Sequence, residues 1–222
     1  MLKYLYYAIG EILLVVLGIL IALQVDTWNR ENSQRKLELQ YYQEMKSQLL
    51  ADKAFLNNEL DYNDGFLEQF QRGISIIDND DRAQEQALAR IVLELKNNSD
   101  FRRQSSIYQT LVNSGEIKYV GNREIIEHLQ RLERNYTYSE RVEEVQRQAV
   151  LQHAVSMIVN NIQIQPLRVQ NPDVLFSYQM QNTLLLFIGL VNEKSSIYRQ
   201  AISNIDTTIG LLDVELASAQ VE

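Results

Sequence analysis

The feature that most constrains this chain is an uninterrupted apolar stretch near its N-terminus. Between Tyr4 and Val25 the only charged residue is Glu11, and residues 12–23 are all Ile, Leu, Val, Gly or Ala. A helix of about 22 residues spans about 33 Å, which is enough to cross the hydrocarbon core of a bilayer. The stretch has tyrosines before it and a tryptophan just after it, and both residue types favour membrane interfaces. We therefore expect residues 1–28 to form a transmembrane anchor.

A cleaved signal peptide is the alternative interpretation of this stretch. Its apolar core would be shorter, and no small-x-small cleavage site follows, because Ala22-Leu23-Gln24 ends on a large polar residue. We therefore expect the anchor to be retained. The positive-inside rule mildly favours a cytoplasmic C-terminal domain, since Lys3 precedes the span and three basic residues follow it, Arg30, Arg35 and Lys36. Short N-terminal anchors can override such a small bias.

Two features of the span are candidate contact sites. Small or apolar residues recur at every fourth position and share one helix face: Gly10, Leu14, Gly18 and Ala22. The small-xxx-small step lets a second helix approach closely, so a homo-oligomer or a membrane-protein partner is one hypothesis; small residues are also simply common in spans. A carboxylate at membrane depth, Glu11, marks an ion path or a polar contact between helices, unless it reaches the headgroups or is protonated.

Composition limits what the remaining residues, 29–222, can form. The chain has 222 residues, of which 45% are hydrophobic, two are proline and eight are glycine; this suits a helical core and is too poor in turn residues for a β-sandwich. The net charge of −8 lies outside the first 25 residues, because Lys3 and Glu11 cancel within them. An acidic domain repels phosphate backbones, so we expect no nucleic-acid partner. The absence of cysteine excludes disulfides, thiolate metal sites and thiol catalysis.

Apolar residues recur at helical spacing along the rest of the chain. The expected helices are Leu37–Ile77, Ala83–Leu95, a short helix within Ser105–Gly115, a long helix capped by Asn122 and running through Ile162, and a final helix centred on the stripe described next. Connections this short make neighbouring helices antiparallel. The predicted fold class is therefore all-α, with an N-terminal transmembrane helix followed by an antiparallel bundle of long helices.

The final helix has the most regular pattern. Its apolar stripe advances in alternating steps of four and three, a 3.5-residue repeat suited to coiled-coil-like bundle packing, with Ser195 as its one polar member. The candidate bundle-interface residues on this stripe are Leu184, Ile188, Val191, Tyr198, Ile202, Ile205, Ile209 and Leu212.

Two segments carry a resemblance to a known family. Tyr7–Asn29 reads YAIGEILLVVLGILIALQVDTWN, and Ile107–Ile117 reads IYQTLVNSGEI. Together they resemble an uncharacterised family of single-pass membrane proteins of Bacteroidota, of the DUF6090 type. The resemblance implies no assigned activity, substrate or cofactor. Members of that family often have a longer basic segment before the span, which implies an inner-membrane protein whose C-terminal domain is periplasmic.

Helical geometry limits the chemistry that the histidines and serines of this chain can carry out. His128 and His153 lie about 37 Å apart on one expected helix, so they cannot share a site. Glu124 and His128 face the same way, and a solvated ion pair explains them more simply than a metal site. Ser105 and Ser106 precede a helix and are typical of caps rather than nucleophiles. We therefore expect no enzyme activity, no metal and no cofactor.

Three functional hypotheses follow. The first is a non-catalytic, membrane-anchored helical scaffold or accessory interaction protein. The second is an envelope sensor or ligand-binding helical domain that acts through a partner. The third is a component of an ion-driven membrane complex that uses Glu11.

Overall fold

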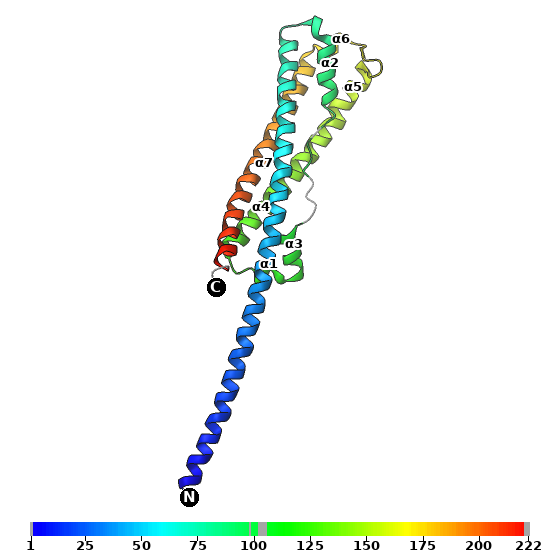
Figure 1. The fold of residues 1–222 in the computed structure, drawn as a ribbon. Helices are drawn as coiled ribbons and strands as arrows, with labels where there is room; N and C mark the ends of the chain where they lie inside the picture. The colour runs from blue at the N-terminus through cyan, green and yellow to red at the C-terminus, as the bar shows by residue number, and fades with distance from the viewer. Residues whose placement is uncertain (1, 98, 102–105, 220–222) are drawn as a thin grey trace.

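The computed structural model describes the backbone of residues 2–97, 99–101 and 106–219, and the side chains of these residues from position 13 onward. The described chain is almost entirely helical, which confirms the all-α class. Figure 1 shows an elongated bundle from which one helix projects alone at the N-terminal end. The end of the bundle where that helix enters is called the proximal end below, and the opposite end is called the distal end.

The projecting helix, α1, is one continuous element of 77 residues, Leu2–Asp78. The sequence pattern predicts an anchor and a bundle helix from Leu37, and the structure joins them without a break. No Gly or Pro occurs between residues 26 and 36, so nothing there interrupts the helix. Arg30 and Asp26 add an ion pair one turn apart, at 3.3 Å. Among the described residues, α1 alone is long and apolar enough to cross a membrane.

Within the bundle, α1 buries a face that repeats every 3.5 residues. The face consists of Tyr42, Met45, Leu49, Asp52, Leu56, Glu59, Asn63, Phe66, Phe70, Gly73 and Ile77, all buried except the half-buried Glu59. Such a repeat keeps the contact line straight along a neighbouring helix. Its three polar members lie in the middle.

The remaining elements return along α1. After a 3₁₀ turn, Arg82–Gln84, the helices α2 (Glu85–Glu94) and α3 (Ile107–Ser114) pack on α1 near the distal and proximal ends, respectively. A second 3₁₀ turn, Glu116–Tyr119, leads to α4 (Arg123–Ala149), the π-helical segment Val150–Ala154 and α5 (Val155–Asn161). A two-stranded hairpin (β1, Ile162–Gln163; β2, Arg168–Val169) and α6 (Pro172–Leu175) precede α7 (Tyr178–Ser218), which packs against both α1 and α4.

The structure confirms the predicted caps at Ser106, Gly115 and Asn122. The Ser106 hydroxyl accepts a hydrogen bond from the Gln109 amide at 3.1 Å. Gly115 closes α3 with φ of 75°, a left-handed conformation that glycine adopts without strain. The Asn122 side chain caps α4 through the Glu124 amide at 2.9 Å. The expected cap at Ser105 lies outside the described residues.

The π-helical segment has a cause in the sequence. A line of buried positions on the second half of this helix advances in steps of four through Gln146, Val150, Ala154 and Ile158. A step of four exceeds the 3.6 residues of an α-helical turn, so the helix must underwind locally to keep these side chains inside. The helix expected to run through Ile162 ends at Asn161, because Ile162 pairs with Val169 in the hairpin.

The core consists of two hydrophobic clusters. The distal cluster gathers around Phe70, Leu88, Val92 and Phe187, and the proximal cluster around Tyr42, Met45, Leu111, Ile125 and Ile205. Buried polar side chains from α1, α4 and α7 lie between the two clusters.

Candidate functional site

The stripe predicted on the final helix lies inside the chain's own bundle. Five of its eight candidate residues are buried, namely Leu184, Val191, Tyr198, Ile205 and Leu212, and Ile188, Ile202 and Ile209 pack against the core from partly buried positions. This stripe therefore lies mostly inside the bundle, where α7 packs against α1 and α4.

The candidate face of the span is not covered by the bundle. Leu14 is 72% exposed and Ala22 is exposed. No atom outside the helix comes within 4 Å of a Cβ placed on Gly18. Gly10 and Glu11 lie outside the residues whose side chains the structure describes. The described part of this face is thus available to lipid or to another helix.

His128 packs against α7, whereas His153 is exposed. His128 Nδ1 lies 2.6 Å from Asn204 Oδ1 on α7, and the Asn204 amide donates to the His128 carbonyl at 3.0 Å. The structure thus pairs His128 with α7 rather than placing it in a solvated pair with Glu124. Among the residues with described side chains, no group of three or more His, Asp or Glu is placed to hold a metal ion.

The first candidate site is a polar layer across the middle of the bundle, which the sequence analysis missed. It is centred on Lys194 of α7, whose side chain is fully buried. The ammonium donates to the Ser99 carbonyl at 2.8 Å and to Gln146 Oε1 at 2.6 Å. Burial lowers the pKa of Lys194 to about 8, against the opposing attraction of Glu143, Glu59 and Asp100.

The carboxylates of the layer hold the segment that carries Ser99. Glu143 of α4 accepts hydrogen bonds from the Phe101 amide at 3.1 Å and from the Tyr198 hydroxyl at 2.8 Å. Glu59 of α1 accepts from the Asp100 amide at 3.0 Å. Burial raises the pKa of both Glu143 and Glu59 above their ordinary value, since it penalises the charged form.

Neutral groups complete the layer. The Ser99 hydroxyl donates to Asn63 Oδ1 at 2.6 Å, and the Asn63 amide donates to the Ser195 hydroxyl at 3.1 Å. Among the described side chains, no buried polar nitrogen or oxygen is left without a partner. The layer therefore holds three helices and residues 99–101 in one register. A signal for it existed in the sequence, because Lys194 and Glu143 fall on the apolar faces of their helices.

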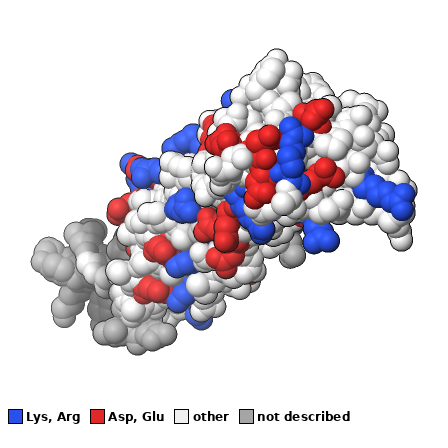
Figure 2. All heavy atoms as spheres, turned by 90° about the horizontal axis from the view of Figure 1, so that it is seen from above, with Lys and Arg blue, Asp and Glu red and all other residues white. Residues whose placement is uncertain are grey.

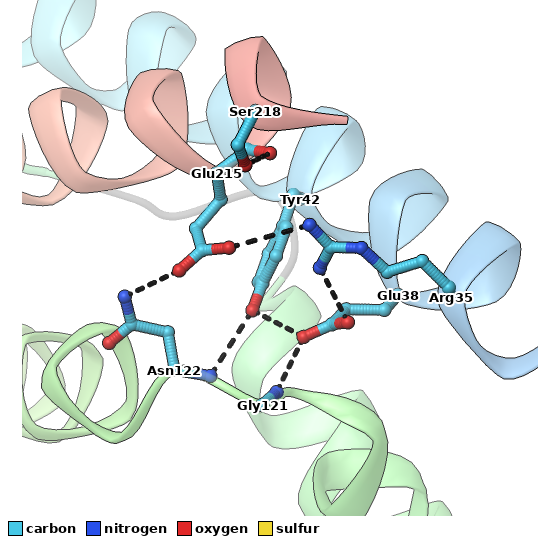
Figure 3. A network of polar contacts seen from close by, with 7 residues as sticks. All are labelled: Arg35, Glu38, Tyr42, Gly121, Asn122, Glu215 and Ser218. Atoms are coloured by element: carbon cyan, nitrogen blue, oxygen red, sulfur yellow. Dashed lines mark hydrogen bonds and ion pairs between the residues drawn. The ribbon is translucent and has the colours of Figure 1, made fainter. Parts of the chain in front are cut away.

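The second candidate site, here called the proximal clamp, lies where α1 leaves the bundle. It consists of Arg35, Glu38, Tyr42, Gly121, Asn122 and Glu215, which come from α1, from the residues that precede α4 and from the end of α7 (Figure 3). Glu38 is its centre. The carboxylate accepts from Arg35 at 2.8 Å, from the Tyr42 hydroxyl at 2.6 Å and from the Gly121 amide at 2.6 Å.

Charge and close packing both fix the clamp. Burial raises the pKa of Glu38, but the hydrogen bonds from Tyr42, Arg35 and Gly121 outweigh it and leave that pKa below its ordinary value. Arg35 also lies 3.6 Å from Glu215, which accepts from the Asn122 side chain at 2.8 Å. A Cβ at Gly121 would lie 2.8 Å from Glu38 Oε1, so a larger residue here would displace this carboxylate from its hydrogen bonds.

Comparison with known proteins identifies the family. The model of the Family of unknown function (DUF6090) matches residues 11–184. The match spans most of the chain, from within the anchor to the first turns of α7, and the chain belongs to this family. Comparison with curated proteins and with solved structures gave no match.

Proposed function

We propose that this member of the DUF6090 family is a non-catalytic, membrane-anchored helical scaffold or accessory interaction protein. The observation that carries the proposal is the continuity of α1, which runs from the apolar span to the distal end of the bundle as one helix. A helix without a break transmits position and orientation, whereas a flexible linker would not. The bundle is thereby held at a set height and rotation relative to its anchor.

The proximal clamp supports this reading. About 11 residues of α1, from Asp26 to Lys36, extend about 16 Å between the apolar span and the bundle. At the point of entry, Glu38 and Arg35 bind α1 to the residues before α4 and to the end of α7. Force applied to the anchor therefore reaches three parts of the bundle at once. Such rigidity suits a protein that positions others.

We further propose an inner-membrane location with the bundle in the periplasm, on the strength of the family resemblance in the anchor. Because the chain lacks cysteine, one introduced thiol reports the side of the membrane. Val214→Cys, at a side chain that is 69% exposed, should react with a membrane-impermeant maleimide once the outer membrane alone is permeabilised. Reaction only after lysis of the inner membrane would place the bundle in the cytoplasm.

The experiment that tests the scaffold is a gentle-detergent extraction of the full-length protein from its native membrane. The mass of the complex is measured by light scattering, and co-purifying proteins are identified. A homo-oligomer or a stoichiometric membrane partner is the expected result. A monomer without partners would overturn the proposal.

A sensor that acts through a partner is the second candidate, favoured by the ionisable groups in the polar layer. A ligand or proton that altered Lys194 or Glu143 would loosen residues 99–101 from α7 or α4, because these two side chains bind that segment. Screening of small molecules against the full-length protein for a rise in melting temperature tests this candidate. A compound that binds the polar layer should no longer raise the melting temperature of the Gln146→Leu variant.

A third candidate is an ion-driven membrane complex that depends on Glu11. Glu11→Gln should abolish function in that case, because the carboxylate would carry the ion. The same change should leave the assembly of a pure scaffold intact. Assembly and function measured side by side therefore separate the two candidates.

A further inference from the structure

The distal half of the bundle carries an almost uncharged stretch of chain. From Gln148 to Asn192 the only Asp, Glu, Lys or Arg residues are Arg168 and Asp173, whereas 23% of the whole chain is charged. Figure 2 looks onto the distal end and shows acidic and basic side chains gathered over one part of it, beside a broad area that is mostly white. Depletion of charge marks the central part of protein interfaces.

A row of apolar side chains is exposed on this stretch. Leu151, Val155 and Val159 are 64%, 38% and 70% exposed. They recur at steps of four, so they form a line along the helix on its outer side. Other exposed apolar residues of the same stretch are Ile164, Tyr178, Leu185 and Leu186.

The row exists because this helix is apolar over a wider face than its own bundle covers. Each exposed member directly follows a buried apolar residue, in the pairs Val150 and Leu151, Ala154 and Val155, and Ile158 and Val159. The first of each pair fills the distal cluster, and the second is left outside it. Single exposed apolar residues need no explanation, but an aligned row in a stretch depleted of charge is typical of a binding surface.

We propose that this distal apolar surface, centred on Leu151, Val155 and Val159, binds the same surface of a second copy of the chain. The inference rests on the scaffold function and names its partner. Copies anchored in one bilayer stand parallel, with the same residues at the same height. A two-fold axis along the membrane normal then brings identical side surfaces together, as an isologous contact requires.

Charge favours a second copy over approach through another face. Arg168 and Asp173 cancel, so the net charge of −8 belongs entirely to the rest of the chain. Two copies that met through another face would bring that negative excess together, whereas the distal apolar surface carries no such cost. The bilayer that holds the anchor is not the occupant, because α5 lies at the end of the bundle away from the projecting helix (Figure 1).

The test uses the full-length protein in detergent or nanodiscs with single introduced thiols. Val159→Cys should give a covalent dimer with a short bismaleimide cross-linker. Val214→Cys is the matched control, because Val214 is 69% exposed, close to the 70% of Val159, but lies near the C-terminal end of α7. Equal cross-linking at both positions, or none at Val159, would overturn the inference.

A charge introduced into the contact gives a second readout. Val159→Asp should weaken self-association by roughly tenfold or more, since a buried unpaired carboxylate is costly at an interface. Val214→Asp should leave it unchanged, and circular dichroism confirms that both variants stay folded. Self-association that survives Val159→Asp but fails in Gly18→Leu would place the contact in the span; the scaffold proposal would then stand and this inference would fail.

Two further outcomes also decide the matter. If Val159→Asp removes a different co-purifying protein and leaves the homo-oligomer intact, the distal apolar surface binds that protein, and the second-copy inference is wrong. If the protein is monomeric and without partners even in its native membrane, both the scaffold and this inference are wrong.

Discussion

The two ends of the bundle are closed in opposite ways. At the proximal end, Glu38 gathers hydrogen bonds from three sides, so charge is paired and neighbouring elements are tied together. At the distal end, the helix of Val155 and Val159 carries apolar side chains that its own bundle leaves exposed. A closed polar network fixes geometry, while uncovered apolar surface favours association. The difference fits our proposal that the proximal end positions the molecule and that the distal end binds a second copy.

The polar layer lies between the proximal and distal ends, and we expect its disruption to have the largest effect on stability. Lys194→Met should lower the free energy of unfolding by about 3–5 kcal/mol, because it removes the cation facing a buried Glu143 and strips the Ser99 carbonyl of its donor. Urea unfolding followed by circular dichroism measures the change. Arg199→Met is the control, since its ion pair with Asp64 is exposed and should matter by less than about 1 kcal/mol. Equal effects would mean that the layer does not hold the two halves together.

The proximal clamp can be broken by one methyl group. Gly121→Ala should lower the free energy of unfolding by about 1–3 kcal/mol, because the new Cβ displaces Glu38 from its hydrogen bond with the buried Tyr42. Gly210→Ala is the control, because nothing lies within 4 Å of the new Cβ. As a Gly→Ala change inside a helix, it should raise the free energy of unfolding by about 0.5–1 kcal/mol. Melting temperatures that move in opposite directions are the expected result. A harmless Gly121→Ala would show that the close contact is not needed.

The proximal clamp and the polar layer should contribute to stability with opposite pH dependence in acid. The folded pKa of Glu38 lies below its ordinary value of 4.5, so its contribution is present above pH 4.5 and is lost as the pH falls through the folded value. Glu143 has the opposite effect on stability, because its pKa is raised and the folded protein binds its proton more readily than the unfolded chain does. Its contribution to stability therefore falls as the pH rises above 4.5. The melting-temperature difference between wild type and Glu38→Gln should therefore shrink below pH 4.5. A constant difference would contradict the assignment.

The smallest expected effect on stability lies at the distal apolar surface. Val159→Asp should change the free energy of unfolding by no more than about 0.5 kcal/mol, because the side chain is 70% exposed. Its effect should appear in self-association instead. Thermal melts at a concentration where the protein is monomeric make the measurement. A large loss of stability there would mean that Val159 belongs to the fold and not to a contact between copies.

Pattern alone was sufficient for the helix caps and for the apolar stripe of the last helix, because their signals are local. The cap at Asn122, the left-handed Gly115 and the 3.5-residue stripe of α7 each lie within a few turns of chain, and all three were predicted. The polar layer was missed although its signal was present, since Lys194 and Glu143 were not set against the apolar faces that carry them. The proximal clamp was missed for a different reason. Its members are separated by up to 180 residues (Arg35 and Glu215), and no local pattern links them.

The sequence by itself determined the apolar span, the helical class and the repeat that lets long helices lie side by side, because hydrophobic periodicity and caps act over single turns. Only the tertiary structure decided which apolar face became core and which stayed exposed. The stripe of Leu184 and Ile205, predicted as a bundle interface, packs against helices of the chain itself, while Leu151 and Val159 stay exposed. The physical reason is that the burial of an apolar face depends on which other helix packs against it, and the arrangement of all the helices in the bundle determines that.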